Sequence, residues 1–292
     1  SFRKEGVPDW EAVSLPHTWN AFDGQDGGGD YYQGVGWYRK TFTMKPDGTQ
    51  VYIRFGAVSK MATVICNGQT VGEHRGGFSA FTFDLTPHLR DGENEILVRA
   101  DNSLNLPIYP RSADFTFFGG IYRDVQLICF DTKVHFDVTT FGTDALFVTP
   151  DAQGQVSISV YAPSGEAVAL SLLDGLGNVV DSGKTISIDG KAQICLTVEH
   201  PMLWDGVEAP NLYTCMASIA DDCISTSFGF RSFSVNPCEG FFLNGRSYPL
   251  HGVCRHQDRE NLGWALTEKE HTEDMTLIRE IGANTVRLAH YQ

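Results

Sequence analysis

The chain has 292 residues, of which 42% are hydrophobic and 20% are charged, and its formal net charge is −14. This length allows two or three domains, and the composition is that of an ordinary globular protein. The acidic balance argues against a nucleic-acid partner, because phosphate binding requires clustered Lys and Arg. No apolar run approaches the ~20 residues of a membrane-spanning helix. Residues 1–10 lack the apolar core of a signal peptide, which leaves the cytoplasm and the periplasm of a bacterium both open.

The cysteines are odd in number and show no Cys-x-x-Cys spacing. Most of them lie inside apolar runs, which favours buried free thiols over a disulfide framework or a zinc site. The chain also contains no Asn-x-Ser/Thr sequon, so we expect a reduced and unglycosylated protein. The seven positions are Cys66, Cys129, Cys195, Cys215, Cys223, Cys238 and Cys254.

Residues 1–132 are predicted to be all-β. Short alternating or β-branched runs are separated by turn signals such as Asn67-Gly68 and Asp91-Gly92, a rhythm typical of a jelly-roll β-sandwich. The glycine-rich stretch 23–34 lacks the lysine and the strand–turn–helix context of a phosphate loop, so we expect a surface loop there. The clearest predicted strands are 38–43, 51–55, 62–66 and 95–100.

Residues 133–235 are predicted to form a second sandwich. About seven strands over a hundred residues are typical of an immunoglobulin-like domain. No group of chemically reactive side chains stands out in this region, and its expected role is to hold its neighbours in place. The runs that carry the prediction are 156–161, 168–173, 185–188, 192–198, 213–219 and 225–230.

Residues 236–292 combine strand and helix signals. Asn244-Gly245 predicts a hairpin between the runs 241–243 and 247–253. Thr267 and Glu270 have capping-box spacing, and Gly282 should end the helix that follows. Residues 284–291 are predicted to form another strand, so the segment has the pattern of the first units of a β/α barrel. The buried stripe of the helix is expected to be Met275, Ile278 and Ile281.

Polar residues gather where these two strands end. Arg255, His256 and Asp258 follow the first strand, and Arg287 and His290 lie on and just past the second. Taken alone, a residue of this kind is more often a surface loop residue, or a histidine whose hydrogen bonds are made within the protein. Together they predict a site, because barrel enzymes place their chemistry at the carboxyl ends of the strands.

The last segment closely resembles glycoside hydrolase family 2, the β-galactosidases and β-glucuronidases. The matching stretches are FFLNG, LHGVCRHQD, EIGAN and VRLAHY. LPHTWN, GVGWYRKTF, NGQTVGEHRGGFSAFTFDLTPHL and FFGGIYRDV are similar to the sugar-binding jelly roll of the family, and LWDG, PNLY and FGFR to its middle domain. RHQD is closer to the β-galactosidase pattern, because β-glucuronidases more often have Lys where this chain has Arg255. A β-glucuronidase or β-mannosidase relative remains the alternative.

The resemblance also implies roles for individual residues. Asp114 occupies the position of an Asp that binds sugar hydroxyls, for which a carboxylate is suited because it accepts charge-assisted hydrogen bonds. His256 and His290 would bind hydroxyls, and Arg287 would support the nucleophile. The substrate-binding set implied for this chain is Asp114, Arg255, His256, Asp258, Arg287 and His290.

Retaining glycosidases need two carboxylates about 5 Å apart, and the family carries both on later barrel strands. Asn94-Glu95 resembles the acid/base motif but belongs to a predicted sandwich strand. We therefore expect an N-terminal portion of a retaining β-glycosidase, without the catalytic carboxylates and inactive alone. The expected partner is a β-galactoside, with homo-oligomerisation open. No metal-ligand set is complete and no cofactor is expected in this chain, while Mg²⁺ or Na⁺ stays open for a longer enzyme.

Two alternatives belong to other functional classes. One is a non-catalytic carbohydrate-binding module of two β-sandwiches, and the other is a purely structural array of sandwiches. Neither requires the hairpin, the capped helix and the strand that leads to His290. Those features favour the enzyme.

Overall fold

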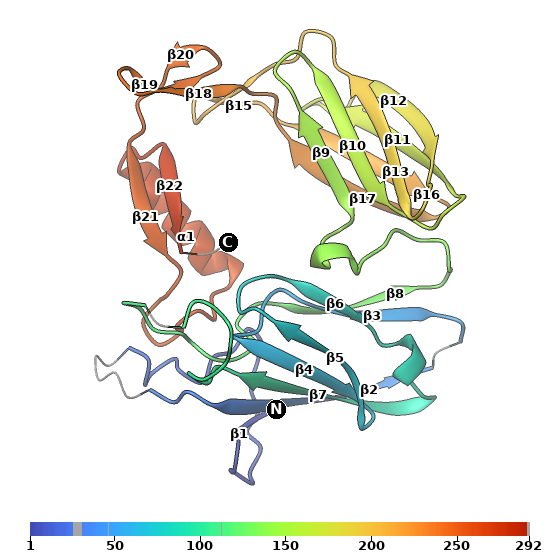
Figure 1. Ribbon diagram of the computed structural model, residues 1–292, viewed down its shortest axis with the longest axis vertical. Coiled ribbons are helices and arrows are strands. Elements are labelled where there is room, and N and C mark those ends of the chain that lie inside the picture. The colour runs from blue at the N-terminus through green and yellow to red at the C-terminus, as the bar shows by residue number, and fades with distance from the viewer. Residues whose placement is uncertain (26–30, 46, 112, 291–292) are drawn as a thin grey trace. The chain divides into compact units, whose positions relative to one another are not determined.

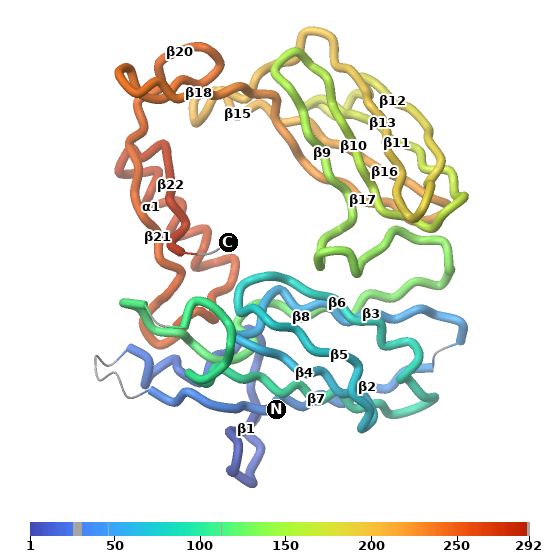
Figure 2. The backbone as a smooth tube through the Cα atoms, viewed as in Figure 1, coloured from blue at the N-terminus to red at the C-terminus, as the bar shows by residue number. Residues whose placement is uncertain are grey.

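The computed structural model describes residues 1–25, 31–45, 47–111 and 113–290 (Figures 1 and 2). Strands dominate this part of the chain, as predicted. It divides into two compact units. The first unit contains Ser1–Thr132 together with Cys254–Ile281 and the residues from Arg287 onward, and the second contains Lys133–Val253 and Gly282–Val286.

The first unit contains the predicted β-sandwich. Its burial pattern alternates along each central strand, so that Val51, Ile53 and Phe55 point into the core between the sheets. The larger sheet has the order β1 (Phe2–Lys4), β2 (Val35–Met44), β7 (Gly92–Asp101), β4 (Met61–Cys66) and β5 (Gln69–Arg75). The smaller sheet has the order β6 (Phe81–Asp84), β3 (Gln50–Phe55) and β8 (Val125–Phe130), and η1 (Thr86–His88) is a short 3₁₀ turn.

The turn between β4 and β5 follows the sequence prediction. Asn67 and Gly68 have φ values of 50° and 80°, the left-handed pair that a two-residue hairpin of this kind requires. The predicted glycine-rich loop 23–34 lies partly outside the described residues, which omit 26–30.

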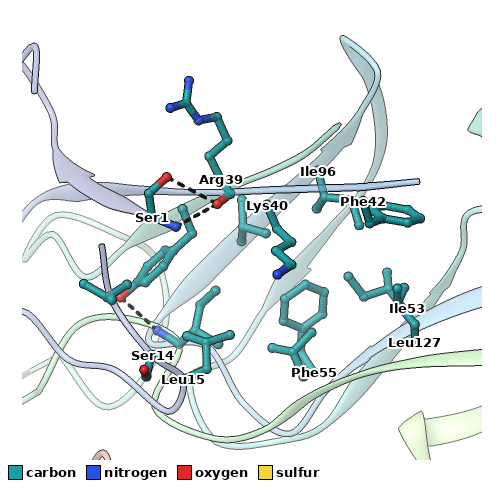
Figure 3. A pocket seen from close by; sticks show the side chains of 15 residues that line it. Ser1, Ser14, Leu15, Arg39, Lys40, Phe42, Ile53, Phe55, Ile96 and Leu127 are labelled. Atoms are coloured by element: carbon teal, nitrogen blue, oxygen red, sulfur yellow. Dashed lines mark hydrogen bonds between the residues drawn. The ribbon is translucent and has the colours of Figure 1, made fainter. Parts of the chain in front are cut away.

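An apolar cavity of about 560 Å³ lies between the two sheets of this sandwich (Figure 3). Ile53 and Phe55 line it from the smaller sheet, and Ile96 and Val98 from the larger one. Ser1 lines one side, where its backbone nitrogen donates a hydrogen bond of 2.8 Å to the carbonyl oxygen of Arg39.

The second unit contains the predicted immunoglobulin-like sandwich. Its core is built from alternate residues such as Val156, Ile158 and Val160, which face the other sheet. One sheet has the order β13 (Lys191–Thr197), β10 (Gln155–Tyr161) and β9 (Leu146–Pro150). The other has the order β12 (Val179–Ile186), β11 (Ala167–Leu173), β16 (Tyr213–Ile219) and β17 (Asp222–Phe228). The minor elements are η2 (Thr140–Gly142) and the paired β14 (Trp204–Asp205) and β15 (Ala209–Pro210).

The predicted hairpin forms at Asn244-Gly245, with φ values of 52° and 77°. The prediction that its second arm would span residues 247–253 was wrong, because the paired strand β20 ends at Ser247. Pro249 has no N–H to donate to a ladder, so the hairpin pairing cannot continue through it. The strands are β18 (Phe233–Asn236), β19 (Gly240–Leu243) and β20 (Arg246–Ser247), and a new strand pair follows, β21 (Gly252–His256) and β22 (Thr285–Ala289).

Helix α1 (Glu268–Glu280) connects β21 to β22 and begins at the predicted capping box. The carboxylate of Glu270 accepts hydrogen bonds from the backbone N–H of Thr267 at 2.9 Å and from its hydroxyl at 2.6 Å. Gly282 follows the helix with a φ of 77°, as predicted for its end.

The predicted buried stripe of α1 was wrong. Met275 is 40% exposed and Ile281 is 70% exposed, although Ile278 is half-buried. Among the described residues, Asp274 of α1 instead accepts hydrogen bonds from Arg255 and Arg259, and Glu270 accepts hydrogen bonds from the cap residue Thr267. Helical spacing indicates an apolar face, but only packing partners can bury that face.

All seven cysteines are free thiols, and Cys66 and Cys215 are buried as expected. The other five are exposed, so the prediction that most would be buried was wrong. Cys195 shows the reason, because it alternates with the buried Leu196 and faces outward from β13. Within the described residues, no helix is both long and apolar enough to cross a membrane.

Candidate functional site

Strand β21 and the residues after it present two different faces. Successive side chains of an extended segment point to opposite sides. Accordingly, His256 and Asp258 are exposed, whereas Arg255 and Arg259 are half-buried and donate hydrogen bonds to Asp274 of α1. Arg255 and His256 are therefore adjacent in the sequence but have different neighbours, Asp274 for the first and His290 for the second.

The exposed face brings together three rings from distant parts of the sequence. The imidazoles of His256 and His290 meet edge to face, with ring centroids 5.0 Å apart. Phe115 stacks on His290 at 5.0 Å, with an angle of 23° between the ring planes. The guanidinium of Arg287 lies 3.3 Å from Nδ1 of His290 and 3.8 Å from the sulfur of Cys254.

A small hollow of about 20 Å³ lies at this cluster. Asp258 lines it together with the two histidines, and the sandwich contributes Phe115 and Thr116. Asp114 directly precedes Phe115 in the chain and is exposed. The structure thus brings His256, Asp258, Arg287 and His290 to one place and puts Asp114 one residue from a ring of that cluster.

The loop after β21 is anchored on the sandwich by Trp264, which is 5% exposed. Its ring lies 5.4 Å from Phe118 and 5.2 Å from Tyr122, measured between centroids. Gly263 has a φ of 53°, and a Cβ on it would lie 2.5 Å from the ring of Phe118. Glycine is therefore required for both its backbone angle and this close approach.

Gln25 adds a polar anchor for the same loop. Its side-chain N–H donates a hydrogen bond of 2.8 Å to the carbonyl oxygen of Arg259, and its side-chain oxygen accepts one of 3.0 Å from the backbone N–H of Asn261. Packing and hydrogen bonds consequently fix this loop on the sandwich of the first unit.

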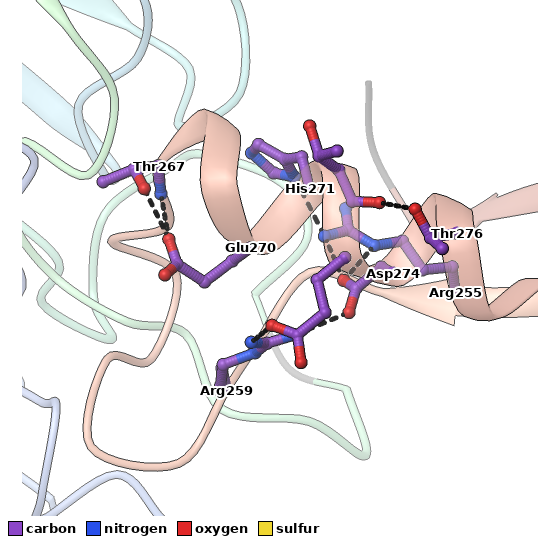
Figure 4. Close-up of polar contacts among 9 residues, drawn as sticks. Arg255, Arg259, Thr267, Glu270, His271, Asp274 and Thr276 are labelled. Atoms are coloured by element: carbon purple, nitrogen blue, oxygen red, sulfur yellow. Dashed lines mark hydrogen bonds and ion pairs between the residues drawn. The ribbon is translucent and has the colours of Figure 1, made fainter.

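Arg255 lies apart from the other predicted substrate-binding residues, because it occupies the opposite face of β21. Its guanidinium donates hydrogen bonds of 2.9 Å and 2.6 Å to one carboxylate oxygen of Asp274 and lies 2.9 Å from Nδ1 of His271 (Figure 4). Arg259 donates to the other oxygen of Asp274 at 2.8 Å. The structure therefore occupies Arg255 with α1, and its predicted contact with a substrate stays a prediction.

Electrostatics tie Asp274 to both arginines. Partial burial raises the pKa of Asp274, but the hydrogen bonds and charges of Arg255 and Arg259 outweigh burial and hold the pKa below its usual value. His271 has a lowered pKa, first because of burial and then because of the Arg255 charge. A charged Asp274 between two arginines is thus the stable state at neutral pH.

Sequence reasoning missed Phe115, Trp264 and Asp274. An alternation of Arg255, Gln257 and Arg259 was visible, and it indicates that the arginines share a face that the histidine does not. The partner of those arginines could not be read from the sequence, because helix and loop geometry decide which acid they meet. Among the described residues, no group of three or more His, Cys, Asp or Glu side chains is arranged to hold a metal ion.

Imidazole nitrogens and carboxylate oxygens together can donate to and accept from hydroxyl groups. An aromatic ring beside them offers an apolar surface. Such a combination suits a polyhydroxylated ligand that also has apolar C–H faces.

Among the proteins of known sequence that are similar to this chain, two match almost its whole length. A β-glucuronidase of Bacteroides fragilis is 38% identical over an alignment 304 positions long, which covers 97% of this chain and 44% of that protein. The β-galactosidase BoGH2A of Bacteroides ovatus is 32% identical over an alignment 315 positions long, which covers 97% of this chain and 35% of that protein. The chain thus spans less than half the length of these relatives.

A solved structure is similar over the full chain. The FMN-binding β-glucuronidase from F. prausnitzii L2-6 superimposes with a TM-score of 0.91 at 40% sequence identity, covering 100% of this chain and 47% of that one. The likeness therefore includes both units.

Three family descriptions match consecutive parts of the chain. The sugar binding domain of glycosyl hydrolases family 2 matches residues 4–130, a second family 2 domain matches 131–231, and the family's TIM barrel domain matches 235–292. Taken together, these matches leave few residues unassigned, and the chain belongs to glycoside hydrolase family 2.

Proposed function

We propose that this chain is the N-terminal portion of a retaining β-glycosidase that removes a terminal β-linked sugar, and that it supplies part of the sugar-binding pocket. The observation that carries the proposal is the convergence of His256 and His290 with Phe115 at the ends of β21 and β22. Strand ends of this kind hold the chemistry of barrel enzymes.

In this proposal each residue has a separate task. His256 and His290 exchange hydrogen bonds with sugar hydroxyls that strengthen toward the oxocarbenium-like transition state. Asp114 and Asp258 accept hydrogen bonds from other hydroxyls. Arg287 beside His290 orients or electrostatically supports the nucleophile, which is provided by a later barrel strand together with the acid/base.

A β-D-glucuronide is the first candidate substrate. The B. fragilis and F. prausnitzii proteins, at 38% and 40% identity, are both named β-glucuronidases. A β-D-galactoside is the second candidate. It is supported by the RHQD pattern with Arg255 and by the B. ovatus β-galactosidase at 32% identity.

The test uses the longer polypeptide that continues from this chain, assayed with nitrophenyl β-D-glucuronide and nitrophenyl β-D-galactoside. Turnover of either substrate, with a first product that proton NMR identifies as the β-anomer, is the expected result. An α-anomer as the first product would refute the retaining mechanism. A purified, folded protein inactive on both substrates and on nitrophenyl β-D-mannoside would refute the glycosidase assignment.

A further inference from the structure

We propose that Asp274 is a positioning residue that sets the places of His256 and Asp258 from the opposite side of β21. The inference rests on the proposed function, because it concerns the same site. Asp274 belongs to α1 and contacts Arg255 of β21 and Arg259 just after it, and is not itself one of the residues proposed to bind the sugar.

The contacts of Asp274 span both ends of a five-residue segment. One carboxylate oxygen accepts two hydrogen bonds from Arg255, and the other accepts one from Arg259 (Figure 4). One side chain of α1 therefore clamps the segment before and after His256-Gln257-Asp258. Hydrogen bonds between ionised partners of this kind are stronger and more directional than neutral ones.

The alternation of the extended segment turns this clamp into a positioning device. Arg255 and Arg259 donate hydrogen bonds to Asp274 of α1, whereas His256 and Asp258 between them are exposed. They meet His290 and line the hollow beside Phe115. Any shift of the two arginines along α1 is transmitted to the histidine and the aspartate between them.

Burial makes Asp274 difficult to replace. The side chain of Arg255 is only 10% exposed and that of Asp274 23% exposed, so water supplies few alternative partners. The second acid on Arg259, Glu273, is 53% exposed and makes no hydrogen bond to Arg255 among those described. In the part of the chain that the structure describes, Asp274 alone accepts hydrogen bonds from both arginines.

The first experiment measures kcat and KM of the longer enzyme with Asp274→Asn and Asp274→Ala. A displacement of about 1 Å in a reacting geometry lowers rates by roughly 10²-fold, so we expect about 10²-fold lower kcat/KM for Ala and about 10-fold for Asn, mostly in kcat. Glu280→Gln, an exposed acid on the same helix, is the matched control and should match the wild type within about twofold.

A double-mutant cycle separates positioning from general stabilisation. In a His256→Ala/Asp258→Ala background, Asp274→Asn should lower the remaining activity by no more than about twofold, because the residues through which it acts are gone. The same loss in both backgrounds would overturn the proposal, as would a single variant Asp274→Asn with wild-type kinetics. Global unfolding of Asp274→Asn, measured by circular dichroism, would also overturn it by showing a role in folding.

Hydrogen exchange provides a readout that does not require activity. Asp274→Asn should speed exchange at residues 256–262 but leave strand β10 unchanged, whereas Glu280→Gln should alter neither. If the wild-type enzyme proves inactive on every glycoside, the proposed function fails, and the exchange result still judges the clamp. Unchanged exchange at 256–262 would refute the clamp even in an active enzyme.

Discussion

The ring of His290 at the end of β22 stacks on Phe115 from the sandwich, with centroids 5.0 Å apart and planes 23° from parallel. The two residues are separated by 175 positions in the chain, and neither neighbourhood alone forms a site. The contact links the strand-end histidines to the loop that carries Asp114. A sugar bound at this place would therefore touch residues from both segments.

Replacing either histidine should impair the longer enzyme. His256→Ala or His290→Ala removes a hydrogen-bonding group that acts most strongly in the transition state, so we expect kcat and kcat/KM to fall together by roughly 10²-fold. Steady-state kinetics with a nitrophenyl glycoside would measure the change. His200→Asn, in an exposed turn of the second unit, is the control and should be silent. Unchanged activity in either variant would remove that histidine from the site.

The close approach of Gly263 to Phe118 should make that glycine irreplaceable. Gly263→Ala adds a Cβ 2.5 Å from the Phe118 ring, whereas Gly282→Ala meets nothing within 4 Å. Both substitutions carry the strain of a positive φ, which costs roughly 1–2 kcal/mol. Gly263→Ala should cost about 1–3 kcal/mol more through overpacking, as measured by urea unfolding. Equal losses in the two variants would contradict the packing described for this loop.

The stability of the first unit should fall as pH decreases from about 6.5 toward 4. Burial lowers the pKa of His17 to about 4. The unfolded chain regains a histidine pKa of about 6.5 and binds the proton first, so up to about 2–3 kcal/mol of unfolding free energy is lost across this window.

Urea titrations at several pH values test this expectation. His17→Gln should show a shallower pH slope than the wild type. The slope should not vanish, because burial also lowers the pKa values of His74 and His271. An identical slope in wild type and variant would mean that His17 titrates normally in the folded protein.

Helix α1 should be less stable than the second sandwich in this chain. Leu277 and Ile281 are 52% and 70% exposed, so little apolar burial offsets the entropy of ordering the helix. Amide hydrogen exchange should be fast across residues 268–282 and slow in β10, where Val156 and Ile158 are buried. Comparable protection of both segments in a chain shown to be monomeric would contradict the expected lower stability of α1.

The chain alone should also lack glycosidase activity. We expect the acid/base and the nucleophile on barrel strands that these 292 residues do not include. The check is an assay of the purified chain against nitrophenyl β-D-glucuronide and β-D-galactoside. Turnover that co-purifies with the chain would show that a carboxylate pair within it is sufficient.

Local rules predicted the elements whose causes are local. The Thr267–Glu270 capping box and the Asn67-Gly68 turn involve side chains and backbone angles within a few residues, and both are present. The same holds for the alternation that makes Val156, Ile158 and Val160 a core face. Such features need no knowledge of a distant partner.

The features that the sequence did not predict depend on residues far apart in the chain. The helix stripe of Met275 and Ile281 was expected to be buried, but burial depends on what packs against the helix. Arg255 was predicted at the same site as His256, and that role stays a prediction, although the sequence did not reveal that its guanidinium is held by Asp274. Asp274 could not be paired with the arginines, because 19 positions separate it from Arg255 and a loop of irregular shape lies between them.

The strongest test of the proposed sugar site is a crystal structure of the longer protein with its product monosaccharide bound. We expect ring nitrogens of His256 and His290 within roughly 2.7–3.2 Å of sugar hydroxyls, with Asp114 at the same sugar and Arg255 still on Asp274. A monosaccharide bound in the active site without contact to either histidine, or held by Arg255 instead, would contradict it.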